Sequence, residues 1–197
     1  MKMPRNSLFL RLIWLLVWLP LLYQSVSGHD AYVRDACNVT RYQDLCIHLL
    51  SPFSLAAKRS PSKWARAGVA VTITEAKSVS QFLVDLNRKR TMRGRNRGAL
   101  LDCVECLSDA IDNLHRALGV LRNLSGTTFE EQMEDLTTWL SAAMSDQGTC
   151  LDGFEGGKGT QVELLRNKVS VMSCVTSNAL ALVIKLATAG PESLMEP

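Results

Sequence analysis

Three carboxylates recur at spacings of four and three residues in the middle of the chain, at Glu105, Asp109 and Asp112. If this stretch is helical, they share one face, because residues three and four apart are neighbours on a helix surface. The ordinary interpretation of such a face is a solvated helix surface. A further acid, Asp152, lies beside Thr149 and Cys150 later in the chain, which favours a role for these carboxylates beyond that of a solvated surface.

The residues that usually carry catalysis or bind metals are scattered. His29, His48 and His115 lie far apart, and none has a second ligand at metal-binding spacing. The CxxC at 103–106 lies within a helical pattern, and no second CxxC completes a zinc site. Nucleophile-elbow and zincin motifs are absent from the sequence. We therefore predict no metal, no cofactor and no enzymatic activity.

The candidate acids depend on a helix over residues 97–124. Its apolar residues alternate at spacings of four and three, which places one stripe along a helix. A helix of roughly 25 residues would be about 37 Å long. The stripe consists of Leu100, Val104, Leu107, Ile111, Leu114, Leu118 and Leu121.

Three more stretches show the same periodicity. Residues 62–88 form one expected helix, with Ser62 as its N-cap and Gly68 as a point of weakness. A second starts at Thr128, whose spacing to Glu131 matches a capping box, and ends near 146–148. The third covers 160–186, and residues 188–197 follow as a flexible tail. No strand is predicted, so the fold class is all-α, an antiparallel up-down four-helix bundle over residues 62–187.

The N-terminal 28 residues have the pattern of a secretory signal peptide. A basic start is followed by an apolar stretch over residues 12–23 and then by small residues. The alternative is a membrane anchor, but about twelve apolar residues interrupted by Pro20 fall short of the roughly 20 needed. No later stretch is read as apolar enough to span, so we expect a secreted protein. Residues 29–61, broken by prolines, form an N-terminal helical hairpin that extends the bundle.

Net charge gives no support to nucleic-acid binding. The chain is formally +3, but residues 1–28 hold three basic and no acidic residues, so the remainder carries 19 of each. The charge is instead local, with six basic residues between Arg88 and Arg97. Two interpretations stay open for this run: a solvated turn favoured by the dipole of the preceding helix, or a patch that binds an acidic polysaccharide.

The chain has six cysteines, all after the expected signal peptide, and an oxidising compartment favours disulfides. Six cysteines allow 15 pairings, among which spacing does not choose. If Cys37 and Cys46 pair, their segment must fold back on itself, because along a straight helix they would be about 13 Å apart. Asn38 and Asn123 begin glycosylation sequons.

Four segments together resemble the plant invertase and pectin methylesterase inhibitor superfamily: residues 37–46, 99–114, 137–154 and 177–183. The resemblance covers residues 31–186, and one inhibitor domain would span about 31–187. It implies a four-helix bundle with an N-terminal hairpin and the disulfides Cys37–Cys46 and Cys103–Cys150. Cys106 departs from the family pattern, where an apolar residue is more usual. With Cys174 it forms either two buried thiols, which we favour, or a third bridge.

The resemblance also implies a function. Members of the pectin methylesterase type form a one-to-one complex that covers the enzyme's substrate cleft, using polar and acidic residues of the middle helices. Matching positions here are Glu105, Asp109, Asp112, Thr149 and Asp152. We therefore expect a glycosylated inhibitor in the apoplast or cell wall, which regulates pectin de-esterification and contacts pectin weakly through residues 88–97.

Three alternatives remain. Family members that inhibit acid invertase, in the cell wall or vacuole, often carry a Pro-Lys-Phe triplet before the last helix, which is absent here. A similar domain is also the pro-region of larger pectin methylesterases, but no catalytic domain follows in this chain. A saposin-like lipid binder belongs to another class, and its cysteines usually staple terminal helices in adjacent pairs, unlike this layout.

Overall fold

The structure is a computed structural model and describes residues 31–194. The expected signal peptide therefore lies outside the described residues. Within them the chain is helical and contains no strand. After helical residues 31–37 come α2 Gln43–Leu50, α3 Ser54–Ala57, α4 Pro61–Arg88, α5 Arg95–Arg122, α6 Phe129–Gly153 and α7 Thr160–Ala189. Short 3₁₀ turns are η1 Ser51–Phe53, η2 Gly126–Thr128 and η3 Pro191–Leu194.

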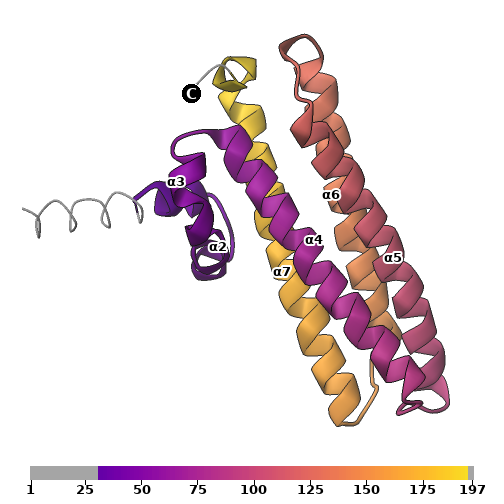
Figure 1. The fold of residues 1–197 in the computed structure, drawn as a ribbon. Coiled ribbons are helices and arrows are strands. Elements are labelled where there is room, and N and C mark those ends of the chain that lie inside the picture. Colours follow the sequence, from indigo (N-terminus) through magenta and orange to yellow (C-terminus); the bar gives the residue numbers. More distant parts are fainter. Residues whose placement is uncertain (1–30, 195–197) are drawn as a thin grey trace, which may run out of the picture.

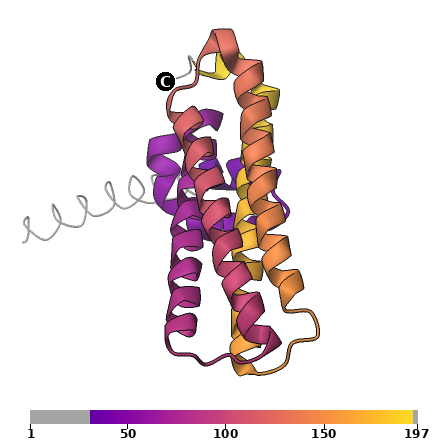
Figure 2. The same ribbon diagram turned by 90° about the vertical axis from the view of Figure 1, so that its right-hand side faces the viewer.

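The four long helices form an antiparallel up-down bundle, which confirms the predicted all-α fold class (Figure 1). Helix α5 packs against α4 and α6, and α7 packs against the same two helices on the other side. The α4–α5 and α6–α7 connections lie at one end of the bundle, and the α5–α6 connection lies at the other (Figure 2). Short connections of this kind favour antiparallel neighbours.

The core follows the predicted stripes. On α5, five of the seven stripe residues are buried, and Val104 and Ile111 are partly buried at the edge of the core. The stripes of α4 and α7 face the same interior, with Leu83, Leu165 and Met172 fully buried. Burying one such side chain contributes about 1.5–3 kcal/mol, so this interior is the main stabilising term of the bundle.

The N-terminal hairpin packs on α4 and α7. A disulfide joins Cys37 to Cys46, with the two Cα atoms 5.8 Å apart, so the chain folds back between residues 31–37 and α2. A second apolar cluster contains both cysteines together with Trp64 of α4 and Leu182 of α7. The Asn178 side chain also accepts from the Tyr42 amide at 3.1 Å and donates to its carbonyl at 2.9 Å.

Of the two predicted N-caps, Ser62 is wrong, and Thr128 is in the predicted position but lacks the predicted hydrogen bond. Helix α4 begins at Pro61, and its cap is Ser60, whose Oγ accepts from the Lys63 amide at 3.4 Å. A proline suits this first position because its missing N–H would have no partner there. Thr128 precedes α6 but makes no side-chain capping bond. Instead the Gln132 amide group bonds to the Ser125 amide at 2.9 Å and the Asn123 carbonyl at 3.0 Å, which closes the turn.

The predicted helix ends also differ. Helix α6 continues through Gly148 to Gly153, so Thr149, Cys150 and Asp152 are helical. The central helix runs from Arg95 to Arg122, about two residues earlier than expected at each end. Residues 188–194 are not a frayed tail, because α7 continues to Ala189 and the η3 turn buries Ser193. At Gly148, tertiary packing of α6 outweighs the low helix propensity of glycine.

By length and composition, helix α7 is long and apolar enough to cross a membrane. The prediction that no stretch after the signal peptide is apolar enough to span is therefore wrong for α7. Half of its most apolar window is buried inside the bundle. Because α7 packs against both α4 and α6, this composition is that of a core helix.

Gly68 has a different role from the predicted one. Helix α4 is continuous through this residue, which was predicted to be a point of weakness in the helix. Gly68 is buried against α7, and a Cβ atom there would lie 2.9 Å from Leu182 Cδ1 and 3.5 Å from the Ala179 Cα. The glycine therefore permits the close approach of α4 and α7.

Substitution of Gly68 by valine should lower the free energy of unfolding by about 1–3 kcal/mol, because the added atoms overpack the α4–α7 contact. Urea unfolding followed by circular dichroism measures this change. The control is Gly119→Ala on α5, where a Cβ meets nothing within 4 Å. It should stabilise the protein by up to about 1 kcal/mol. Equal effects at the two glycines would refute the assigned close contact.

Candidate protein-binding surface

The acidic residues gather on α5 and α6, which lie side by side (Figure 2). Helix α6 carries six acidic residues and no lysine or arginine. Helix α5 carries four acidic residues in its middle, with its basic residues toward the two ends. We call the ten acids of these two helices together the acidic face. It consists of Asp102, Glu105, Asp109, Asp112, Glu130, Glu131, Glu134, Asp135, Asp146 and Asp152.

A disulfide joins the two helices that bear these acids. Cys103 of α5 bonds to Cys150 of α6, with the Cα atoms 4.4 Å apart and both residues buried. One turn further along, a Cβ on Gly153 would lie 3.4 Å from the Ala99 Cβ. The small residues let the helix backbones approach closely, so the two acid-bearing helices pack directly against each other.

The five predicted binding residues are all exposed, on two neighbouring helices. Glu105, Asp109 and Asp112 lie along α5, while Thr149 and Asp152 lie in the last two turns of α6. The Thr149 hydroxyl donates to the Ser145 carbonyl at 3.0 Å, so it is partly engaged within its own helix. The structure thus puts all five residues on the accessible surface, with the covalent bridge between their helices.

Two residues at the junction of the helices were not predicted from the sequence. Asn113 Nδ2 of α5 donates to Asp146 Oδ2 of α6 at 3.4 Å, and both residues are half-buried. Asp109 and Cys106 lie near enough to interact electrostatically with Asp146. The available signal was the spacing of Asp146, three residues before Thr149 and six before Asp152. Because the predicted helix ended near 146–148, Asp146 was not placed on the same helix as Thr149 and Asp152.

Burial and like charge perturb two groups at this junction. Partial burial raises the pKa of Asp146, the Asn113 hydrogen bond opposes that rise, and the Asp109 charge adds to it. Burial also raises the pKa of the Cys106 thiol, and the negative charges of Asp146 and Asp109 raise it further. A thiol in this environment is held in its protonated, less nucleophilic form.

Cys106 and Cys174 are unpaired and half-buried, on α5 and α7 respectively. Cys174 lies beside Tyr42 of the hairpin, where a hydrogen bond to the thiol raises the tyrosine pKa. In residues 31–194 no group of three or more histidine, cysteine or acidic residues could hold a metal ion. The sequon residues Asn38 and Asn123 are exposed, and their glycosylation remains a prediction.

A helical bundle with a disulfide-linked acidic face is a scaffold of the kind that binds another protein through a preformed surface. The family model described as plant invertase/pectin methylesterase inhibitor matches residues 31–182, and the chain belongs to this family. It is 47% identical over 167 residues to pectinesterase inhibitor 6 of Arabidopsis thaliana, covering 84% of this chain and 80% of that one.

Two further relatives extend the comparison. The chain is 32% identical to the 21 kDa protein of Daucus carota, covering 83% of this chain and 87% of that protein. A crystal structure of a mutant form of a pectin methylesterase inhibitor from Arabidopsis matches with a TM-score of 0.61 and 20% identity. That match covers 82% of this chain and 94% of the other. At this identity the structural match supports the fold.

Replacement of Asp146 by asparagine tests the junction electrostatics. A carboxyl whose folded pKa is raised favours folding when protonated, and this contribution is lost as pH rises through the folded pKa. At pH 7 the variant should therefore be more stable than the parent, by no more than about 1 kcal/mol because the group keeps solvent contact. The difference should vanish as pH falls toward the ordinary aspartate value of 3.8.

Urea unfolding at pH 7 and near pH 3.5 measures both stabilities. A variant that is less stable than the parent at pH 7 would contradict the assigned burial and like-charge cost. The amide of asparagine keeps an acceptor for Asn113, so loss of that hydrogen bond does not obscure the comparison.

Proposed function

We propose that this protein is a secreted inhibitor of pectin methylesterase. It forms a one-to-one complex that covers the enzyme's substrate cleft and so limits pectin de-esterification. The observation that carries the proposal is the membership of the chain in this inhibitor family, with 47% identity to a pectinesterase inhibitor over most of both chains. The exposed, disulfide-linked acidic face supplies a surface suited to this role.

The physical basis of the inhibition is imitation of a substrate by fixed charges. An enzyme cleft that accepts a polyanionic sugar chain presents complementary positive potential. In this proposal Glu105, Asp109 and Asp112 occupy that cleft with their carboxylates, and Thr149 and Asp152 contact its edge. The bundle is already folded around a buried core, so association costs little ordering of the backbone.

Two other functions are less well supported. Acid invertase is the second target of the family, but the connection at 155–159 reads Glu-Gly-Gly-Lys-Gly and lacks the triplet common in invertase inhibitors. A lipid-binding role would require an accessible apolar interior, whereas the large side chains of the stripes close a packed core. The protein acts in this proposal by occupying an active site and carries out no reaction of its own.

The proposed location is the apoplast or cell wall. The signal-peptide pattern of residues 1–28 directs the chain to the secretory route, where the two disulfides can form. Asn38 and Asn123 are exposed and are the proposed glycosylation positions. Both the enzyme and its pectin substrate would then share the compartment of the inhibitor.

Charge reversal on α5 tests the proposed binding surface. The double variant Asp109→Lys/Asp112→Lys should raise the inhibition constant toward a plant pectin methylesterase by roughly tenfold or more, because like charges would meet across the interface. The control Glu75→Lys reverses a charge on α4, away from the acidic face, and should stay within about twofold.

Circular dichroism checks that each variant folds, and the same inhibitor is titrated against an acid invertase. An unchanged inhibition constant in the folded double variant would remove these residues from the proposed interface. Inhibition of invertase without inhibition of pectin methylesterase would replace the proposed target.

A further inference from the structure

Basic residues gather at one end of the bundle, where the α4–α5 and α6–α7 connections lie (Figures 1 and 2). Segments 88–97 and 155–166 together hold eight basic and two acidic residues. We call these eight residues the basic end. They are Arg88, Lys89, Arg90, Arg93, Arg95, Arg97, Lys158 and Arg166, and all are exposed.

The two segments are in contact, so the basic end is one surface. A Cβ on Gly157 would lie 3.3 Å from Asn96 Oδ1, which places the α6–α7 connection against the start of α5. Met92 fixes the other connection, because its side chain is 5% exposed and belongs to the main core. With Met92 buried, Arg90 and Arg93 on either side of it remain in solvent.

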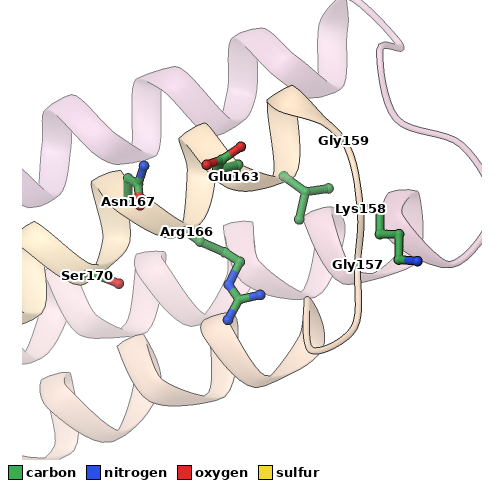
Figure 3. Close-up of a pocket in the computed structure, with 8 residues that line it drawn as sticks. Gly157, Lys158, Gly159, Glu163, Arg166, Asn167 and Ser170 are labelled. Carbon is green, nitrogen blue, oxygen red and sulfur yellow. The ribbon is translucent and has the colours of Figure 1, made fainter.

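A depression of about 500 Å³ lies beside the second segment. Lys158 and Arg166 line it, together with Glu163, Asn167 and Ser170 of α7. Figure 3 shows the Arg166 guanidinium extending from α7 in a different direction from the Glu163 carboxylate. Both cations of this depression therefore remain available to an anionic ligand.

Almost none of this positive charge is neutralised internally. Among the described residues, only Arg88 of the basic end forms an ion pair, with Asp85 at 3.0 Å on the same helix. A helix dipole accounts for cations at the end of α4, but not for the cations of the second connection or at the start of α5, where a cation is unfavourable. The clustering of cations at this end of the bundle therefore cannot be explained by the dipole of α4 alone.

The chemistry of the basic end favours an acidic polysaccharide. Six of its eight residues are arginines, whose planar donors match carboxylates in pairs. Segments 88–97 and 155–166 contain no aromatic residue on which bases could stack. In segment 88–97 the one large apolar side chain, Met92, is buried, and in segment 155–166 Leu164 is the one exposed large apolar residue, which leaves little to insert into a lipid surface.

We infer that the basic end binds carboxylate-bearing sugar chains, of the kind that pectin de-esterification produces. This inference rests on the proposed function, because removal of methyl esters is the step that creates these carboxylates. Binding of the product by one end of the bundle leaves the acidic face free for the enzyme. The inhibitor would then be retained where the esterase has already acted.

Titration of the purified chain with size-defined polygalacturonate, without enzyme, tests the inference. Calorimetry in 50 mM and 200 mM NaCl should give binding that weakens with salt, because screening reduces attraction between exposed charges. Fully methyl-esterified pectin should bind at least about tenfold more weakly, since it lacks the charges that the arginines recognise.

Two variants separate the contributions of the two segments. Arg90→Glu/Arg93→Glu and Lys158→Glu/Arg166→Glu should each weaken polygalacturonate binding by roughly tenfold. The control Lys58→Glu/Arg59→Glu changes two exposed cations before α4 and should bind like the parent. Circular dichroism verifies that each protein is folded.

Equal affinity for the esterified polymer, or an equal loss in the control, would overturn the inference. Tighter binding to duplex DNA or to anionic vesicles of phosphatidylserine and phosphatidylcholine would also overturn it. Inhibition of pectin methylesterase is measured separately. If inhibition is present and polymer binding absent, this inference fails alone; if only polymer binding is present, the proposed function fails alone.

Discussion

The bond between Cys103 and Cys150 is the constraint on which the proposed binding surface depends. It holds two acid-rich helices together, with the Cα atoms of the two cysteines 4.4 Å apart. The carboxylates of the two helices repel one another. The cysteines lie 47 residues apart in sequence, and closing such a loop in the unfolded chain stabilises the folded state by about 4 kcal/mol in the chain-entropy model. The acidic face can therefore be dense in carboxylates without separating α5 from α6.

Charge is distributed unevenly over a common core. The charged residues of helix α6 are all acidic, whereas the basic end gathers eight exposed basic residues. The apolar stripes pack the four helices independently of this pattern, so surface charge can specialise without loss of the fold. In our proposals, one small bundle offers its negative surface to a protein and its positive surface to a polymer.

Periodicity in the sequence predicted the four long helices and most of the main core, because each stripe repeats over many turns. The prediction failed where contacts between helices determine the structure. Gly68 would weaken an isolated helix, but here it allows α7 to approach α4 closely. Gly148 likewise suggested an end to α6 that burial of Cys150 and Phe154 overrides. The Asn113–Asp146 contact joins residues 33 apart, and no local pattern encodes such a pair.

Hydrogen exchange of the inhibitor alone and bound to a plant pectin methylesterase tests the central claim most directly. If the acidic face enters the enzyme's cleft, amides in the middle of α5 and the last turns of α6 should gain protection in the complex. Amides of α2 and of the outer surface of α4 should exchange as in the free protein. Protection confined to α4, α7 or the hairpin, with α5 and α6 unchanged, would contradict the account.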